Sequence, residues 1–478
     1  MKVKQPVSRA PPAAQLDPQL AQLAAEASMP STSADRRALI MGLGGVAAGA
    51  FLASSRTAQA GPIAPPSGPI TSTGRTLSEI EPRTPITQLP FTITASGCYY
   101  LTGDLNTSST GTAITVSTSG VTIDLNGFSL IGSYGATGKA ISGGGSAGYL
   151  TVRNGMIKYF ATAAIDVPAA ERVTIENVTC YGTGAGGSTA IAVGDYATIR
   201  SCSVRSYAIG VNAVGGTTTL VEGCRVATCA SYGIQVGNSS LVSGCALDGA
   251  GGAFGIQVGV NCVVKRCAIA NFGTGVSAVS GTPQVTVAGC TIQCGNGIML
   301  NDQRILVENC QVQSTYNGVR CGDSSIVRSC IVSNSSSTRS TFAGIDVGNI
   351  SRVEDCCVFA YDRGILGDVT ASIERCTVNN CNTAVTVGSY GNVSGCTLDF
   401  GTTGVLANGY QVRVVDNKIS RFDPCVNCTS NNSTLVARNQ FSETGANPVI
   451  NNNATCAVGP MLGPNLATAT NPWANIRI

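Results

Sequence analysis

The phrase Val264-Lys265-Arg266-Cys267-Ala268-Ile269 indicates the fold, because it recurs along the chain at a nearly constant interval. Its form is V/I-x-x-C-x-V/I/L, and successive copies place their cysteines 20 to 26 residues apart. Self-similarity at a short fixed period is typical of solenoids, in which each repeat stacks on the next. The repeated cysteines are Cys202, Cys224, Cys245, Cys267, Cys290, Cys310, Cys330, Cys356, Cys376 and Cys396.

A second phrase, Gly-I/V-x-V or a close variant, lies between successive copies of the first, as at Gly233-Ile234 and Gly255-Ile256. Apolar and polar residues alternate in both phrases, so each repeat carries at least two short strands with one face inward. Gly, Asn and Ser turns join these strands, and no helical segment separates them. The period of about 22 residues therefore favours a coil of parallel strands over βαβ units. Leucine-rich repeats are rejected because their regular Leu spacing is missing.

The N-terminal phrases Leu89-Pro90-Phe91-Thr92-Ile93-Thr94 and Gly97-Cys98-Tyr99-Tyr100-Leu101 are interpreted as a cap. The run Val121-Thr122-Ile123-Asp124-Leu125-Asn126 begins the full repeats. With the repeats after them, they resemble the pectate-lyase-like right-handed β-helix superfamily, specifically bacterial exported proteins of the carbohydrate-binding and sugar-hydrolase type. The resemblance implies an all-β fold, a right-handed parallel β-helix with about 14–16 rungs of about 22 residues.

We predict four segments from the composition along the chain. Residues 1–60 form an export signal of the twin-arginine type, because Asp35-Arg36-Arg37 precedes an apolar run and Ala58-Gln59-Ala60 follows it. Residues 61–88 form a linker, 89–445 the β-helix and 446–478 a C-terminal cap. The apolar run is short and Gly-rich for a membrane helix, so we expect cleavage before Gly61 and no stable membrane span. The mature protein would then be periplasmic or extracellular.

Charge and composition exclude several classes of function. The chain carries 29 Lys and Arg against 26 Asp and Glu, a formal net charge of +3 that gives no basic face for nucleic acid. It contains no His, which removes imidazole metal ligands and His-based catalysis. Because galacturonan hydrolases of the resembled superfamily use a Gly-His-Gly element, that activity is excluded.

The repeated cysteine is predicted to form a ladder inside the coil, since stacked rungs bring equivalent residues about 4.8 Å apart. Asn417 and Asn439 occupy the same slot in later repeats, and Asn amides can bond from rung to rung. We expect buried free thiols in this ladder, with off-ladder cysteines such as Cys425 and Cys428 left as candidates for disulfide pairing. A soft-metal site at these two residues is the alternative, but a single CxxC is a weak signal. We predict no metal and no cofactor.

Arg320 and Asp346 are the candidate site residues. They are adjacent in the outward series of the second phrase, which runs Gln235, Gln257, Ser277, Met299, Arg320, Asp346, Leu366 and Thr386. The repeat between them is lengthened at residues 333–340, and inserted loops build binding walls in solenoids. The competing interpretation is a surface ion pair. The other strand carries a set of charged residues of both signs, which we interpret as a structural charge ladder. They are Lys265, Glu308, Arg328, Glu354 and Glu374, next to Arg266, Asp355 and Arg375.

Aromatic residues also recur near fixed places in the repeat. They either form an exposed row on which sugar rings could stack or fill the inner corners of the coil, and we favour corner filling. These residues are Tyr159, Tyr207, Phe272, Tyr316, Tyr361, Phe400 and Phe422, with Tyr232, Phe254 and Phe342 before the second phrase.

The sequence favours a carbohydrate-recognition or structural envelope scaffold, adhesin-like and without a recognisable catalytic set. The alternative is a polysaccharide lyase or glycoside hydrolase. Regular repeats with one lengthened member argue for the scaffold, because enzymes of this fold interrupt several rungs with long loops. A polysaccharide is the expected partner, and the oligomeric state is left open.

Overall fold

The structure is a computed structural model that describes residues 81–108, 110–133, 138–279, 281, 283–336, 340–429, 433–444, 448–451, 456–463 and 471–478. The predicted export signal at 1–60 and residues 61–80 of the predicted linker lie outside the described residues, as do parts of the predicted cap. No helix in the described ranges is long and apolar enough to cross a membrane.

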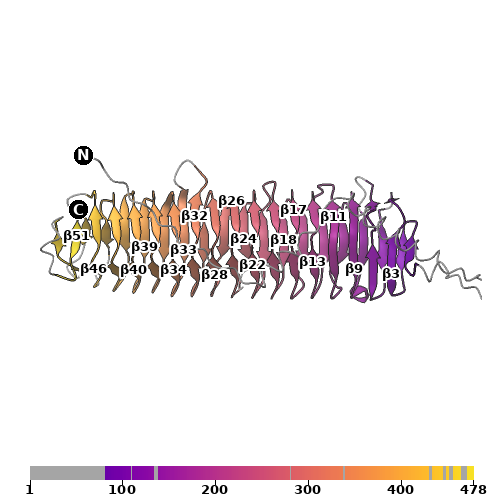
Figure 1. Cartoon of the computed structure of the whole chain (residues 1–478), viewed down its shortest axis with the longest axis horizontal. Coiled ribbons are helices and arrows are strands. Elements are labelled where there is room, and N and C mark those ends of the chain that lie inside the picture. The colour runs from indigo at the N-terminus through magenta and orange to yellow at the C-terminus, as the bar shows by residue number, and fades with distance from the viewer. Residues whose placement is uncertain are drawn as a thin grey trace, which may run out of the picture. The chain divides into compact units, whose positions relative to one another are not determined.

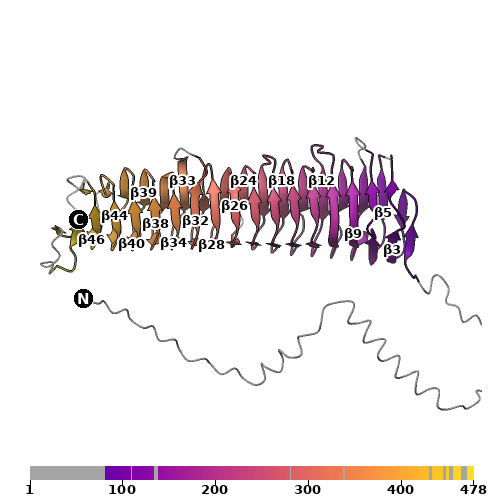
Figure 2. The same cartoon turned by 45° about the horizontal axis from the view of Figure 1, so that its top comes forward.

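The described chain winds into a right-handed parallel β-helix of about 16 rungs with about 22 residues each, which confirms the predicted fold. Strands of successive rungs stack along one axis (Figure 1), and those on each side run in the same direction (Figure 2). One short 3-10 helix, η1 (Gly145–Ala147), interrupts the strands in the described part of the chain.

The smaller strand stack, called sheet B, contains the Gly-I/V-x-V phrases. Its strands are β2 (Phe91–Ile93), β5 (Thr112–Val116), β8 (Lys139–Gly143), β10 (Ala163–Val167), β12 (Thr189–Val193), β15 (Ile209–Ala213), β18 (Tyr232–Val236), β21 (Phe254–Val258), β24 (Thr274–Ala278), β27 (Asn296–Leu300), β30 (Val319–Cys321), β33 (Ser340–Val347), β36 (Tyr361–Gly367), β39 (Thr383–Val387), β42 (Thr403–Ala407), β45 (Val426–Cys428) and β48 (Val449–Asn451). Each pairs in parallel with the equivalent strand of the next rung, as Ile234 of β18 does with Ile256 of β21.

The larger stack, called sheet A, contains the cysteine phrases and bends at each ladder position. Its strands are β1 (Thr84–Ile86), β3 (Gly97–Leu101), β4 (Leu105–Asn106), β6 (Val121–Asp124), β7 (Ser129–Ile131), β9 (Thr151–Lys158), β11 (Thr174–Tyr181), β13 (Thr198–Arg200), β14 (Ser203–Arg205), β16 (Leu220–Glu222), β17 (Arg225–Ala227), β19 (Leu241–Ser243), β20 (Ala246–Asp248), β22 (Val263–Lys265), β23 (Ala268–Ala270), β25 (Thr286–Ala288), β26 (Thr291–Cys294), β28 (Leu306–Glu308), β29 (Gln311–Ser314), β31 (Ile326–Arg328), β32 (Ile331–Asn334), β34 (Arg352–Glu354), β35 (Cys357–Phe359), β37 (Ser372–Glu374), β38 (Thr377–Asn379), β40 (Asn392–Ser394), β41 (Thr397–Asp399), β43 (Arg413–Val415), β44 (Lys418–Ser420), β46 (Leu435–Ala437), β47 (Gln440–Ser442), β49 (Ala457–Val458), β50 (Met461–Leu462) and β51 (Asn475–Arg477).

The coil extends beyond the predicted 89–445 at both ends. β1 lies inside the predicted linker and pairs with β3, burying Ile86. At the other end β49 pairs with β46, and β51 pairs with both β47 and β50. These terminal strands are three residues long or shorter and carry neither repeat phrase, so the periodicity does not reveal them.

The corners of the coil are built from residues in the left-handed backbone region. Arg266 (φ 53°) precedes ladder residue Cys267. The backbone N–H of Arg266 donates a hydrogen bond to the carbonyl of Ala288 in the next rung, at 2.9 Å. The left-handed conformation costs an L-residue about 1–2 kcal/mol of free energy, and the cost is smallest for Asn and Gly. Ile350 (φ 58°) occupies another such corner and is 67% exposed, so a β-branched side chain sits there without compensating burial.

The ten ladder cysteines point into the coil, where each is 2% exposed or less, and none forms a disulfide. The slot lies just inside the corner, so each thiol can donate to main-chain carbonyls. Cys267 Sγ, for example, lies 3.4 Å from the Lys265 carbonyl oxygen and 3.9 Å from that of Val242.

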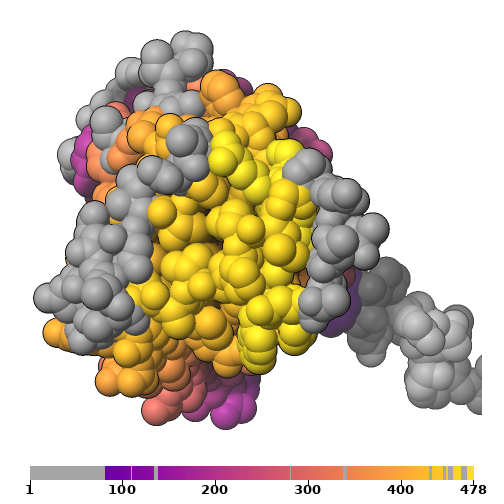
Figure 3. Space-filling model, turned by 90° about the vertical axis from the view of Figure 1, so that its left-hand side faces the viewer, coloured from indigo at the N-terminus to yellow at the C-terminus, as the bar shows by residue number. Residues whose placement is uncertain are grey.

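Amides replace thiols at the C-terminal end of the slot. The Oδ1 of Asn439 accepts hydrogen bonds from the backbone N and the Nδ2 of Asn417, each at 3.0 Å. Asn475, which the sequence analysis did not identify, continues the series: its Oδ1 accepts from Asn439 N at 3.0 Å and from Asn439 Nδ2 at 3.1 Å. All three amides are buried, and the last strands fill the centre of the end face (Figure 3).

Replacing Asn439 by alanine is expected to destabilise the C-terminal rungs by about 2–5 kcal/mol, because it leaves several buried partners without a hydrogen bond. The measurement is the midpoint of chemical denaturation. Asn408→Ala, at an exposed position nearby, is the matched control and should change the midpoint little. Equal effects of the two substitutions would contradict a stabilising amide series.

Replacing Ile350 by asparagine is expected to stabilise the protein by about 0.5–1 kcal/mol, because asparagine tolerates the left-handed region better than isoleucine. The chain itself carries asparagine at an equivalent corner, Asn261 (φ 57°). The denaturation midpoint reports the change. Val369→Asn, at an exposed neighbouring residue that is not left-handed, should give no such gain.

Candidate functional site

The structure brings the two predicted site residues together on the outer face of sheet B. Arg320 of β30 and Asp346 of β33 are register partners, and Arg320 Nε lies 3.2 Å from Asp346 Oδ2. The Arg320 side chain is 52% exposed, whereas that of Asp346 is 22% exposed. The pair is thus an ion pair whose carboxylate is sheltered and whose cation faces solvent.

Four charged groups act on one another here. Burial raises the pKa of the Asp346 carboxyl above its ordinary value. The positive charges of Arg320 and Arg363 lower this pKa, and the negative charge of Asp368 raises it. Arg363 lies in β36, and Asp368 follows that strand. A sheltered carboxyl with a raised pKa is suited to proton donation, and two guanidinium groups are suited to holding an anion.

The lengthened rung was expected to supply a binding wall beside Arg320 and Asp346. Within the lengthened segment, residues 337–339 lie outside the described residues, and β33 pairs with β36 with a register shift between Ser340 and Ala343. The hollows described below are lined by neither Arg320 nor Asp346.

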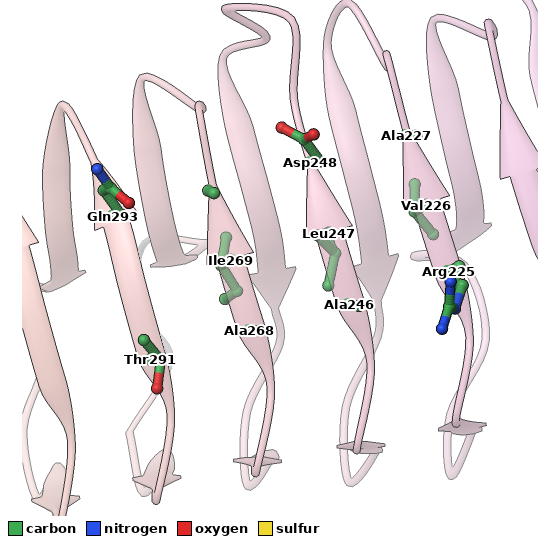
Figure 4. Close-up of a pocket in the computed structure, with 11 residues that line it drawn as sticks. Arg225, Val226, Ala227, Ala246, Leu247, Asp248, Ala268, Ile269, Thr291 and Gln293 are labelled. Atoms are coloured by element: carbon green, nitrogen blue, oxygen red, sulfur yellow. The ribbon is translucent and has the colours of Figure 1, made fainter.

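One hollow of about 310 Å³ lies on sheet A, across β17, β20, β23 and β26 (Figure 4). It forms because Ala246 and Ala268 face outward where the neighbouring rungs carry Arg225 and Thr291. Short side chains between longer ones leave a shallow apolar depression with few polar groups. Such a surface offers little to orient a ligand.

The predicted charge ladder is present only in part on the outer face of sheet A. Glu308, Arg328, Glu354 and Glu374 are consecutive register partners, and Arg328 Nη2 lies 2.6 Å from Glu308 Oε2. Exposed pairs of this kind contribute about 0–1 kcal/mol each. The signs alternate from Glu308 to Glu354, but Glu374 is a second acidic residue in succession, and Lys265 has no charged register partner.

A row of large exposed side chains lies at a corner near the N-terminal end. Arg172 Cζ is 5.5 Å from the ring centres of both Tyr149 and Tyr196, which are 59% and 51% exposed. All three residues are left-handed corner residues on successive rungs. We call them the Tyr-Arg-Tyr ridge. The guanidinium between the two rings holds both in place through cation–π contacts.

A polar hollow of about 640 Å³ adjoins this ridge and shares Tyr149 with it. Hydroxyl groups and one carboxylate supply the hydrogen-bonding atoms of its wall. Its lining residues are Ser117, Thr118, Ser119, Gly145, Ser146, Gly148, Tyr149, Ala169 and Glu171. An aromatic surface beside convergent polar groups is a recurrent form of small-ligand site.

The aromatic residues singled out from the sequence divide between the two interpretations. Tyr207, Phe272, Tyr361 and Phe422 are buried and fill the inside of the coil, whereas Tyr316, Phe342 and Phe400 are exposed. The ridge itself was missed. Its signal was present, because each of its residues stands two places before a strand-opening Thr, in Tyr149-Leu150-Thr151, Arg172-Val173-Thr174 and Tyr196-Ala197-Thr198.

The described residues contain no group of three or more Cys, Asp or Glu arranged to hold a metal ion. The CxxC pair considered from the sequence is buried: Cys425 and Cys428 are each 0% exposed. Burial raises the pKa of each of these thiols to about 12.

Replacing Asp346 by asparagine is expected to stabilise the protein at neutral pH. Because the folded-state pKa is raised, ionisation of Asp346 costs stability as the pH rises above the unfolded value of about 3.9. The gain should therefore vanish in acid. Asp399→Asn is the matched control, since its carboxyl is 23% exposed but has its pKa lowered by Arg421.

For Asp399→Asn, we expect a loss of stability at neutral pH that disappears as the pH falls through the lowered folded-state pKa. Denaturation midpoints measured between about pH 3 and pH 7 distinguish the two cases. A loss of stability in Asp346→Asn at pH 7 would show that the ion pair with Arg320 outweighs burial.

One protein-family model agrees with the fold. The family described as "Right handed beta helix region" matches residues 139–292 and 229–358. No curated protein sequence matches significantly. A tailspike mutant of E. coli bacteriophage HK620 in complex with a pentasaccharide aligns over 83% of this chain and 72% of its own, with 11% identity and a TM-score of 0.38.

Two other solved structures align less extensively. The Dettilon tailspike protein aligns over 66% of this chain at 11% identity with a TM-score of 0.31, and this chain spans only 59% of its length. The catalytic domain of a GH87 α-1,3-glucanase in complex with nigerose aligns over 70% of this chain and 63% of its own, at 12% identity and a TM-score of 0.27. At these identities nothing follows about activity. The repeated strands and their register show that the described chain is a right-handed parallel β-helix.

Proposed function

We propose that the protein is an exported carbohydrate-recognition scaffold that binds a polysaccharide at the Tyr-Arg-Tyr ridge and the polar hollow beside it. The observation that carries this proposal is the pair of exposed rings, Tyr149 and Tyr196, held on either side of Arg172. Sugar rings present apolar C–H faces and a rim of hydroxyls. They pack on aromatic faces and hydrogen-bond to neighbouring polar groups.

The geometry suits a short stretch of glycan that runs along the coil axis. Tyr149 and Tyr196 are two rungs apart, so their backbones are separated by about 10 Å. The hydroxyls of Ser117 and Ser146 and the carboxylate of Glu171 line the adjoining hollow on the side of Tyr149. Arg172 adds a positive charge between the rings, which would favour a glycan with acidic groups.

Export belongs to the same proposal. A polysaccharide-binding scaffold acts where cell-surface glycans are, and the twin-arginine pattern before Ala38 is the feature that supports a periplasmic or extracellular location. Many unoxidised interior thiols suit a chain that folds in a reducing compartment before export.

A second candidate function is a polysaccharide lyase or hydrolase centred on Arg320 and Asp346. The observation in its favour is the sheltered Asp346 carboxyl with its raised pKa, beside the guanidinium of Arg320. Such a carboxyl would act as the general acid.

The test is a glycan-array screen of the protein, followed by titration of each glycan that binds. Tyr149→Ala and Tyr196→Ala are each expected to weaken binding at least about tenfold, or about 1.4 kcal/mol. Tyr390→Ala is the matched control, because Tyr390 is a left-handed corner residue that is 57% exposed, and it should leave binding unchanged.

Binding that survives both ridge substitutions would exclude the ridge as the site. Each bound glycan is then incubated with the protein and examined for new reducing or unsaturated ends. Cleavage that Asp346→Asn abolishes would favour the second candidate function over the scaffold.

A further inference from the structure

The Tyr-Arg-Tyr ridge lies at the corner where the chain leaves sheet B, since its three residues follow β8, β10 and β12. Backbone hydrogen bonds carry this corner onward to the next rungs. The N–H of Tyr196 donates to the Thr217 carbonyl, and the N–H of Thr218 donates to the Asn238 carbonyl, each at 2.9 Å. The ridge therefore continues without a break towards the C-terminal end of the coil.

A second hollow, of about 250 Å³, begins on the rung next to Tyr196. Val214, the first of its lining residues, directly follows β15, which pairs with β12. The hollow extends along the same corner past the ends of β18, β21 and β24. Four valines and one asparagine supply its side chains, the other lining residues are glycines, and none of these described residues is charged.

The shape of the second hollow follows from its glycines and valines. A Cβ at Gly237 would lie 1.8 Å from the Gly216 carbonyl oxygen, so the close approach of the two backbones excludes a side chain at this position. Val214 and Val279 stand at its sides and are 48% and 43% exposed. Their methyl groups face the solvent and form apolar walls above a floor of backbone.

Asn238 is the one polar side chain of this hollow. Its Oδ1 accepts a hydrogen bond from the backbone N–H of Val260 at 2.9 Å, which fixes the amide and leaves Nδ2 to donate to a ligand. An apolar recess with one fixed N–H donor suits a group that joins a methyl to a carbonyl oxygen. The acetamido group of an N-acetylated sugar has this composition.

We infer that the glycan-binding site continues from the ridge into the second hollow, and that this hollow takes the acetamido group of an N-acetylated sugar within an acidic polysaccharide. The inference rests on the proposed function, because it extends the ridge. Arg172 and Asn238 are three rungs apart, so the acidic group and the acetamido group would lie about 14 Å apart along the axis.

The length of the combined site calls for a polymer. The polar hollow, the ridge and the second hollow together follow eight successive strands of sheet B, from β5 to β24 (Figure 2). Seven intervals of about 4.8 Å give a span of about 34 Å. Contacts at both ends of such a span reinforce each other only in a glycan long enough to reach both.

The experiment measures the affinity of the full chain for hyaluronan fragments of increasing length and for polygalacturonate fragments of the same lengths. Both polymers are acidic, but only hyaluronan carries acetamido groups. The affinity for hyaluronan is expected to rise at least about tenfold once a fragment can reach from the ridge to the second hollow. Polygalacturonate should show no comparable gain.

Asn238→Asp tests the N–H donor of the second hollow. The substitution keeps an acceptor for the N–H of Val260 but replaces the donor by a charged oxygen, so the gain with long hyaluronan fragments should disappear. Asn408→Asp is the matched control, because it adds the same charge at an exposed asparagine directly after β42, outside the site. It should leave the gain unchanged.

Val214→Ser tests the apolar wall and gives a second variant if Asn238→Asp folds poorly. It should reduce the gain about threefold or more, because the acetamido methyl loses part of its apolar contact. Val369→Ser is its matched control, since Val369 is 43% exposed and does not line the hollow. This control should leave the gain unchanged.

Equal gains with length for the two polymers would overturn the inference. So would a gain that persists in both Asn238→Asp and Val214→Ser. In either case the proposed function stands if Tyr149→Ala and Tyr196→Ala still weaken the binding of short fragments. Binding of short fragments that neither ridge substitution weakens would overturn the proposed function as well.

Discussion

Successive rungs are joined by backbone hydrogen bonds that run along the axis of the coil, and these bonds hold equivalent residues in register. Ile234 is the register partner of Ile256, and Ile256 is the register partner of Val276. Equivalent residues of successive rungs therefore form a column with a spacing of about 4.8 Å. A side chain in such a column has its own counterparts as nearest neighbours. Each column must therefore be compatible with itself, whether it faces the interior or the solvent.

This constraint explains the interior slot at the corner. A thiol is small and apolar enough to repeat ten times without a large buried polar cost. Near the C-terminus the slot changes to amides, and Asn417, Asn439 and Asn475 satisfy one another and nearby carbonyls. Buried amides are stabilising only when paired, so this series depends on all its members being in register.

On the outside the same register has a different consequence, because outward positions are free of packing and can collect functional groups. Arg328 pairs with Glu308 on sheet A, and Gln235 donates a hydrogen bond to Gln257 at 2.8 Å on sheet B. The Tyr-Arg-Tyr ridge is another self-compatible column, in which a guanidinium separates two rings. Binding surfaces on a solenoid arise in this way from short runs within a column, with the coil as a rigid support.

The architecture could be predicted from the amino-acid sequence alone, since the period of the Cys and Gly phrases specifies both the strands and the rung length. The sequence also placed Arg320 beside Asp346, because counting within a repeat is enough to predict register. Three features could be seen only in the folded chain: Asp346 is sheltered, Asn475 extends the amide series, and Tyr149, Arg172 and Tyr196 form a ridge beside a hollow. Periodicity reports which residues share a column. Exposure and contacts between columns depend on how corners and irregular segments fold, and these parts of the chain do not repeat.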